Sequence, residues 1–122
     1  MGTGSYSSTT EAGRKGEEIA RGYLRSHGFA ILASNYRYGR AEVDIIARDS
    51  DVLVFCEVKL RQNDRFGLPE ESVTPRKQRQ IRKAALGYIA AKDMEGQICR
   101  FDVLAIEKKG MSVEVRHWKN AF

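Results

Sequence analysis

The chain has 122 residues, enough for one domain around one hydrophobic core, and its 42% hydrophobic and 30% charged residues are ordinary for a globular protein in water. It contains no run of apolar residues long enough to cross a membrane, which takes about 18 or more. The net charge of +5 and the isoelectric point near 9.4 favour an anionic partner such as nucleic acid, although a basic protein without such a partner has the same balance.

The N-terminal segment predicts a tail followed by a helix. Residues 1–10 are mostly Gly, Ser and Thr, and we expect a flexible tail outside the fold, with residues 11–122 forming one domain. The segment lacks an apolar signal region, so we expect a cytoplasmic protein. A helix is predicted over residues 11–27, with Gly28 in the position that ends it.

One acidic residue of this helix stands at the edge of its apolar face. At ~100° per residue, Glu17 lies within about 20° of Leu24, whereas Glu18 points to solvent. A carboxylate at such a boundary is either a solvated helix charge or a group that reaches over the sheet toward a metal site. The helical pattern alone leaves both interpretations open.

A first strand is predicted over residues 29–33, and residues 35–40 are expected to form a loop. Two arginines, among them Arg37, alternate here with Tyr36 and Tyr38. Arginines suit phosphate contacts and aromatic rings suit base stacking, but an ordinary exposed loop has the same composition.

The stretch from Glu42 to Arg61 predicts a hairpin, because two runs rich in β-branched residues flank the polar turn at residues 49–51. The second run is almost wholly apolar, which is typical of a central strand buried on both faces. A charge buried in such a strand is costly unless it is paired or binds a metal. Asp44 on the first strand and Glu57 on the second are therefore either mutually compensated or functional.

The expected geometry of these acids favours a metal site. Lys59 is two residues from Glu57 on one strand, so both point to the same face. A tight hairpin places Asp44 opposite the middle of the second strand, several ångströms from Glu57, and the two carboxylates converge if the register slips or the strands splay at that end. Two carboxylates with a backbone carbonyl, which we assign to Val58, form an oxygen-rich set that suits Mg²⁺ or Mn²⁺. These groups and a nearby lysine are the parts that metal-assisted phosphodiester hydrolysis needs.

The polar segment 62–71 is predicted to be a mobile loop beside this site, and a second helix begins after it. Thr74 is placed to cap the helix and Pro75 to occupy its first position. Lys77 extends the apolar stripe that contains Ile81, so we expect it to face inward.

Basic residues crowd the start of this second helix: Arg76, Lys77, Arg79, Arg82 and Lys83. Cations at a helix N-terminus oppose the macrodipole, typically by a few tenths of a kcal/mol each. A phosphate docked there would offset both the cations and the free N–H groups. The alternative is a solvated basic face.

The C-terminal part predicts a strand over residues 98–106 and an edge strand with alternating charges over residues 113–118. Asp102 is interpreted as a structural residue that pairs with Arg100 or Arg37. His27 and His117 are interpreted as surface residues, isolated from each other and from the acids.

Five sequence blocks in order resemble the YraN-type family of bacterial proteins. They are Gly16-Glu17-Glu18-Ile19-Ala20, Asn35-Tyr36-Arg37, Ala41-Glu42-Val43-Asp44-Ile45-Ile46, Val54-Phe55-Cys56-Glu57-Val58-Lys59-Leu60-Arg61 and Arg100-Phe101-Asp102-Val103. The aspartate followed by Glu-x-Lys also resembles the PD-(D/E)XK nuclease superfamily. The chain departs from the family pattern at Ala41, which replaces a glycine, and at Cys56, which replaces a valine, and neither residue supplies a metal-binding atom.

The resemblance implies an α/β domain with a restriction-endonuclease-like mixed central sheet flanked by helices, and an endonuclease that cleaves DNA or RNA. We prefer DNA, including branched DNA, and a homodimer would be consistent with this class. Asp44, Glu57 and the Val58 carbonyl are expected to bind Mg²⁺ or Mn²⁺, Glu17 to add a ligand through water, and Lys59 to act on the phosphate. The residues expected to contact nucleic acid are Arg37, Arg61, Arg76, Lys77, Arg79 and Lys83.

Two other classes of function compete with this one. The chain could be a nucleic-acid-binding module that keeps the fold without cleaving, or a protein-interaction factor whose acidic cluster is structural. The intact set of Asp44, Glu57 and Lys59 argues against the interaction factor, but possession of metal ligands does not separate an enzyme from a binding module.

Overall fold

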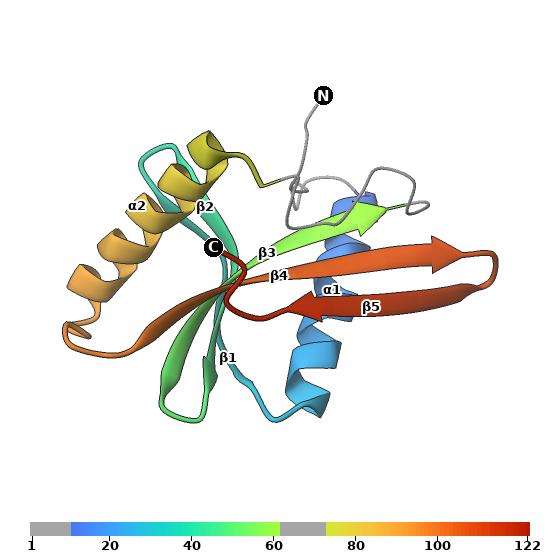
Figure 1. The fold of residues 1–122 in the computed structure, drawn as a ribbon, viewed down its shortest axis with the longest axis horizontal. Coiled ribbons are helices and arrows are strands. Elements are labelled where there is room, and N and C mark those ends of the chain that lie inside the picture. The colour runs from blue at the N-terminus through green and yellow to red at the C-terminus, as the bar shows by residue number, and fades with distance from the viewer. Residues whose placement is uncertain (1–10, 62–72) are drawn as a thin grey trace.

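The computed structural model describes residues 11–61 and 73–122 (Figure 1). The elements follow the predicted order of helix, three strands, helix and two strands. They are α1 (Glu11–Ser26), β1 (Ala30–Tyr38), β2 (Ala41–Asp49), β3 (Val52–Arg61), α2 (Pro75–Ala91), β4 (Cys99–Lys109) and β5 (Ser112–Trp118). The tail predicted for residues 1–10 and the loop predicted for residues 62–71 lie outside the described residues.

The strands form one five-stranded mixed sheet in the order β1-β2-β3-β4-β5. β3 and β4 are parallel, and the other neighbouring pairs are antiparallel. A parallel pair needs a crossover connection, and α2 lies in the one that joins β3 to β4. The apolar run predicted as a central strand is indeed the middle strand, and the predicted edge strand is β5. The architecture is α/β and consistent with a restriction-endonuclease-like fold, as predicted.

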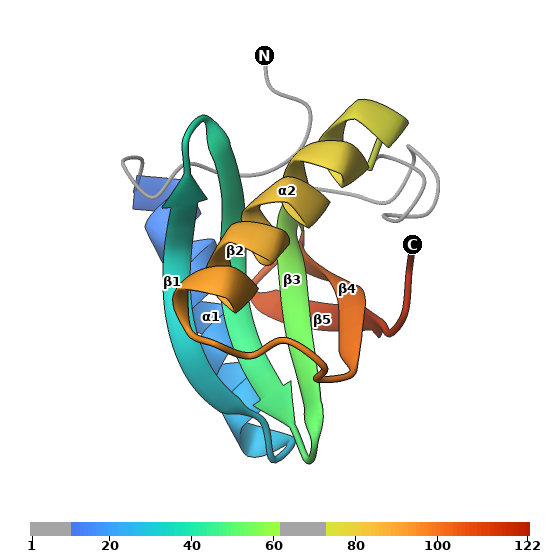
Figure 2. The same cartoon turned by 90° about the vertical axis from the view of Figure 1, so that its left-hand side faces the viewer.

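Each face of the sheet is covered by one helix. Figure 2 shows α2 crossing in front of β1, β2 and β3, with α1 behind the sheet. Alternate residues of β3 enter the two cores, because Phe55 packs with the cluster under α2 and Val54 packs with the cluster under α1. Neither described helix is long and apolar enough to cross a membrane.

The helix boundaries follow the local signals of the sequence. α1 ends before Gly28, which has a φ of +89° that favours glycine. Thr74 caps α2, because its Oγ1 accepts a hydrogen bond from the N–H of Lys77 at 3.1 Å, and Pro75 is the first helical residue. Both caps agree with the prediction.

The predicted loop over residues 35–40 was wrong, because β1 continues to Tyr38 and only Gly39 and Arg40 form the turn. The strand continues because Tyr36 packs against α2. The ring of Tyr36 meets the ring of Tyr88 edge-on, with 5.1 Å between their centroids. Tyr36 is half-buried and packs against the core under α2, so it is not the freely exposed loop residue that was predicted.

Candidate active site

The β2–β3 hairpin has a two-residue turn, with Ser50 in the left-handed region at a φ of +55° and Asp49 paired to Val52. The predicted turn at residues 49–51 was one residue too long. The observed register runs to Ile45 opposite Cys56, so Asp44 lies just beyond the paired residues, near the part of β3 that carries Glu57. Beyond this register, the side chain of Asp44 reaches the backbone of Val58, the residue next to Glu57.

The strand β2 is irregular where it carries Asp44. Val43 packs with the cluster under α2 and Ile45 packs with the cluster under α1, so the alternation of faces breaks between them. Counted from the turn, the β2–β3 hydrogen-bonded pairing also ends at Ile45, so Asp44 is the first residue of β2 outside it. Here the side chain of Asp44 replaces a backbone partner, because its Oδ2 accepts a hydrogen bond from the N–H of Val58 at 2.9 Å.

Two lysines approach the second carboxylate from different elements. Lys59 lies on the same face of β3 as Glu57, and its Nζ is 3.9 Å from Glu57 Oε2. Lys77, in the first turn of α2, places its Nζ 3.8 Å from the same oxygen. The expectation that Lys77 faces inward is confirmed. Asp44, Glu57 and Lys59 are each at most 3% exposed, so this charged group lies within the protein.

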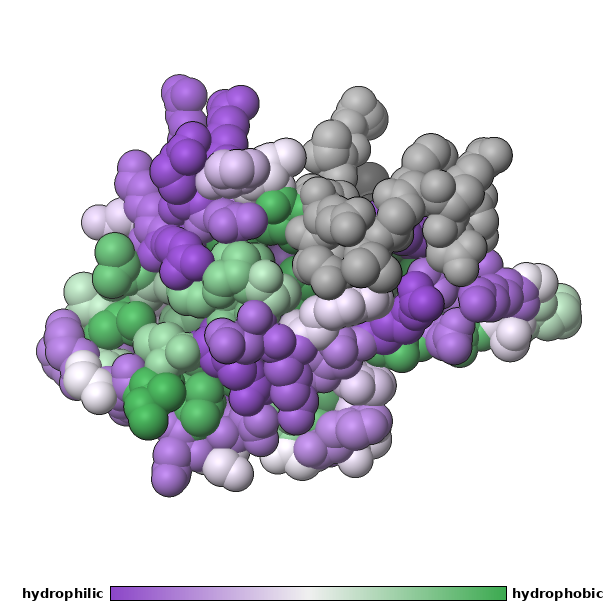
Figure 3. Space-filling model, viewed as in Figure 1, coloured by the Kyte–Doolittle hydropathy of each residue, from purple (hydrophilic) through white to green (hydrophobic). Residues whose placement is uncertain are grey.

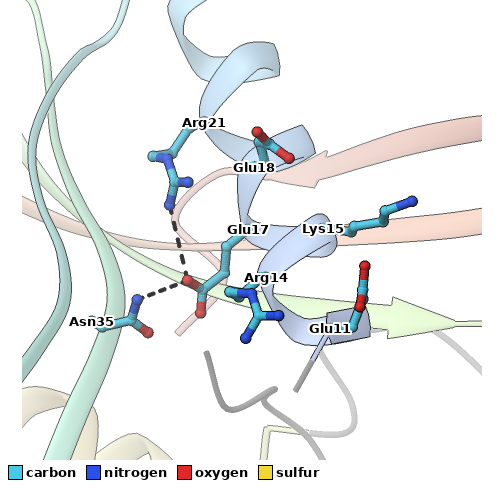
Figure 4. A pocket seen from close by; sticks show the side chains of 7 residues that line it. All are labelled: Glu11, Arg14, Lys15, Glu17, Glu18, Arg21 and Asn35. Carbon is cyan, nitrogen blue, oxygen red and sulfur yellow. Dashed lines mark hydrogen bonds and ion pairs between the residues drawn. The ribbon is translucent and has the colours of Figure 1, made fainter. Parts of the chain in front are cut away.

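The third acid comes from α1 and lies beside a cavity of about 410 Å³ (Figure 4). Glu17 is 2% exposed, and its Oε1 accepts a hydrogen bond from Asn35 Nδ2 at 2.8 Å. Arg21 lies 3.9 Å from the same oxygen. Within the described residues, Glu17 Oε2 and Asn35 Oδ1 are buried without a hydrogen-bond partner. Glu17 is thus not the solvated helix charge that was one of its two interpretations.

The sequence alone did not identify Asn35 as the partner of Glu17. Asn35 lies in β1 with a φ of +52°, a left-handed conformation that asparagine tolerates better than most residues. The family block Asn35-Tyr36-Arg37 was a signal that this position matters, but the contact is set by how α1 packs against β1.

The environment shifts the pKa values of these groups. Burial, then the charge of Glu57, raises the pKa of Asp44 well above its usual value, and the hydrogen bond from Val58 opposes the shift. Burial raises the pKa of Glu17 against the hydrogen bond from Asn35. Burial also lowers the pKa of Lys59, although Glu57 opposes this. Each shift favours the neutral form of its group. A cation bound beside Asp44 and Glu17 would stabilise their charged forms, which burial disfavours.

The oxygen atoms gathered here fit a hard divalent cation. The N–H and C=O of a strand residue point to the same side, so the Val58 carbonyl faces β2, toward Asp44. Among residues 11–61 and 73–122, no group of three or more His, Cys, Asp or Glu side chains is placed to hold a metal ion. A Mg²⁺ or Mn²⁺ ion would therefore need Asp44, Glu57, the Val58 carbonyl and several waters, a combination typical of Mg²⁺.

The other predicted nucleic-acid contacts come from α2, β3 and β1. Arg76, Arg79 and Lys83 are exposed on α2, and Figure 3 shows hydrophilic side chains gathered over the start of α2. Arg61 ends β3 on the face that carries Glu57. Arg37 is exposed on β1 and lies 3.8 Å from Glu42.

The interpretation of His117 as an isolated surface residue was wrong. Its side chain is 6% exposed, and its Nε2 lies 2.7 Å from Asp102 Oδ2. Asp102 also accepts two hydrogen bonds from Arg100, at 2.9 Å each, which confirms the structural pairing predicted for it. The pairing of β4 with β5, which aligns Leu104 with His117, brings the histidine near this acid, and sequence spacing could not show that.

Comparisons with known proteins give one consistent family. The family model described as "Uncharacterised protein family UPF0102" matches residues 16–106. The UPF0102 protein of Geotalea daltonii is 50% identical over 111 residues, which cover 90% of this chain and 87% of the relative. That of Chlorobaculum parvum is 48% identical over 116 residues, or 90% of each chain, and that of Syntrophus aciditrophicus is 44% identical over 110 residues, or 90% of this chain and 87% of the relative.

Proposed function

The chain belongs to the uncharacterised protein family UPF0102, as its sequence blocks predicted, and we propose that it is a metal-dependent endonuclease that hydrolyses phosphodiester bonds of DNA. The observation that carries the proposal is the convergence of Asp44, Glu57 and Lys59 at the irregular end of the β2–β3 hairpin. Burying these charges together is costly for a fold that does not use them.

Each residue has a distinct role in the proposed chemistry. Asp44, Glu57 and the Val58 carbonyl would hold Mg²⁺ or Mn²⁺, and the ion when bound would polarise the phosphate and make a water more acidic. The N–H of Val58 keeps the Asp44 carboxylate oriented. Glu17, with its buried Oε2, would hold a water beside the site.

The lysines would act on the phosphate group. Lys59 is buried beside Glu57, and its ammonium group can donate a hydrogen bond to a phosphate oxygen as negative charge develops there. The lowered pKa of Lys59 also brings it closer to exchanging a proton near neutral pH. Lys77, which is 29% exposed, joins the buried group to the exposed basic start of α2, where the backbone of the substrate would be held.

A second candidate is a nucleic-acid-binding module of the same fold that does not cleave. The observation in its favour is that Lys59 and Lys77 both approach Glu57 Oε2, within 3.9 Å. Two cations beside one carboxylate can offset its charge without a metal ion. Both candidates use the exposed basic residues of α2, so they differ only in chemistry.

The deciding experiment is a cleavage assay in Mn²⁺ with linear, flapped and four-way-junction DNA and the matching RNA. Wild-type protein should cleave at least one DNA substrate, and the Asp44→Ala/Glu57→Ala variant prepared in parallel should cleave none. Binding to the same substrates without cleavage would favour the binding module. Sedimentation at several protein concentrations would test the homodimer, which could place two such sites against two strands.

A further inference from the structure

At the end opposite Glu11, α1 leads into β1 (Figure 1). The residues around this end, with others from β2 and the C-terminal part of the chain, line a second cavity. Its volume is about 380 Å³, within the range of small-molecule sites. It is lined by Tyr23, His27, Phe29, Asp49, His117 and Lys119. The candidate active site uses none of these residues.

Aromatic rings make up most of the cavity wall. The rings of Tyr23 and His27 are 4.1 Å apart between centroids, and those of Tyr23 and His117 meet edge-on at 5.6 Å. Phe29 lies 5.7 Å from His117, measured in the same way. A wall of this kind favours a flat, π-bonded ligand, which can stack on one ring and meet others at their edges.

The polar groups of the wall are held in fixed positions. Asp102 accepts the Nε2–H of His117 at 2.7 Å, so Nδ1 is left to face the hydroxyl of Tyr23 at 3.4 Å. Asp102 itself is buried and also accepts hydrogen bonds from Arg100 and from the N–H of Asn120. The Asp102 network is thus complete without a ligand, and it serves to orient the imidazole at the cavity.

Charged groups of both signs line the cavity with the rings. Asp49 contributes a carboxylate, which Arg100 holds at 3.1 Å, and the exposed Lys119 places its Nζ 5.9 Å from the centre of the Phe29 ring. A purely apolar ring would desolvate these groups without offering them hydrogen bonds. A ligand that combines a flat ring, a hydrogen-bonding edge and an anionic group matches all of them.

We propose that this cavity binds one unpaired nucleotide, with its base against the ring cluster of Tyr23, Phe29 and His117 and its phosphate at Lys119. The inference rests on the proposed action on nucleic acid and adds a second contact point for the strand. Ten residues of α1 and its end separate Glu17 from His27, about 15 Å at 1.5 Å per residue. That span equals about four stacked nucleotides at 3.4 Å each, so a strand held at the active site could reach the cavity.

The test uses the histidines as reporters, because the chain has only two and both line the cavity. Their Cε1–H signals would be followed by NMR in metal-free buffer with EDTA, so that the result does not depend on cleavage. Adenosine and cytidine monophosphates at millimolar concentration should shift both signals, and inorganic phosphate should not. If neither nucleotide nor a single-stranded oligonucleotide shifts them, the proposal is overturned.

Two further arms identify the source of the nucleotide and the role of the lysine. A short single-stranded DNA should bind at least about tenfold more tightly than a mononucleotide if the occupant belongs to a strand, because the two contact points are linked. Equal affinity for the two ligands would mean that the cavity binds a free nucleotide, and it would overturn the proposal that the occupant belongs to a strand. Lys119→Gln should weaken mononucleotide binding about fivefold, whereas replacement of Lys108, an exposed lysine on β4 that does not line the cavity, by Gln should not. If the two variants bind the mononucleotide equally well, Lys119 does not contact its phosphate.

The experiments distinguish failure of the endonuclease proposal from failure of the nucleotide-cavity proposal. A protein that cleaves no substrate can still show the histidine shifts, which would support a nucleotide cavity on a binding module. A protein that cleaves DNA without histidine shifts would keep the active site and lose the cavity. Both measurements use the full chain.

Discussion

Replacing Asp44 by asparagine should stabilise the metal-free protein while removing its response to metal. The substitution keeps the shape of the side chain and an oxygen that can accept the hydrogen bond from Val58. It removes a negative charge that is 2% exposed and that interacts unfavourably with the charge of Glu57. A residue retained for binding a cation is expected to cost stability when the cation is absent.

The size of the effect follows from the geometry of the hairpin. Glu57 is one of the charges that raise the pKa of Asp44, and side chains that meet across neighbouring strands are about 5 Å apart. Two like charges at that distance repel by about 3 kcal/mol at an effective dielectric constant near 20. Lys59 and Lys77, both within 3.9 Å of Glu57 Oε2, offset part of this. We therefore expect the free energy of unfolding of Asp44→Asn to exceed that of wild type by about 1–3 kcal/mol near pH 8.

The difference should depend on pH with a definite sign. Burial, then the charge of Glu57, raises the pKa of Asp44 in the folded protein above its unfolded value of about 3.9. The folded state therefore holds this proton more tightly, and the stability that this provides is present at low pH and lost as pH rises through the folded pKa. The variant has no such loss, so its advantage should be absent near pH 4 and grow above it.

Urea unfolding followed by far-UV circular dichroism, with and without Mn²⁺, measures both effects. Saturating metal at 100 times the dissociation constant should stabilise wild type by about 2.7 kcal/mol and leave the variant unchanged. Glu18→Gln, which removes an exposed charge on α1, is the control and should change neither value. A metal-free Asp44→Asn protein that is less stable than wild type near pH 8 would refute the reasoning, because the acids would then be structural ion-pair partners.

Three further changes test the remaining roles. Glu57→Gln should weaken Mn²⁺ binding in calorimetry while the circular dichroism spectrum stays native, and equal affinity would remove Glu57 from the metal ligands. Lys59→Ala should reduce cleavage by roughly 10²-fold or more and leave affinities for nucleic acid and Mn²⁺ within a few-fold, whereas equal cleavage would place the activity elsewhere. Replacing three exposed residues of α2 together by alanine (Arg76, Arg79 and Lys83) should lower the slope of log affinity for duplex DNA against log salt by about 2.7, and an unchanged slope would make them a solvated face.

Several features were predictable because they depend on local chemistry. Thr74 and Pro75 predicted where α2 begins, and Gly28 predicted where α1 ends, since caps need particular side chains and backbone angles. The apolar run of β3 predicted its central place. Glu57 and Lys59 were expected on one face of that strand because side chains alternate with a period of two.

Other features were decided by tertiary structure, because they depend on pairing between distant segments. The irregularity at Asp44 and the two-residue turn set how β2 meets β3, and a change of one residue in register moves every side chain to the other face. The hydrogen bond between Asn35 and Glu17 requires α1 to pack on β1, and the contact of His117 with Asp102 requires β5 to pair with β4. The sequence by itself determined which residues could carry the chemistry and the order of the elements. Only the folded sheet decided which of them meet, since strand pairing joins residues that local propensity cannot connect.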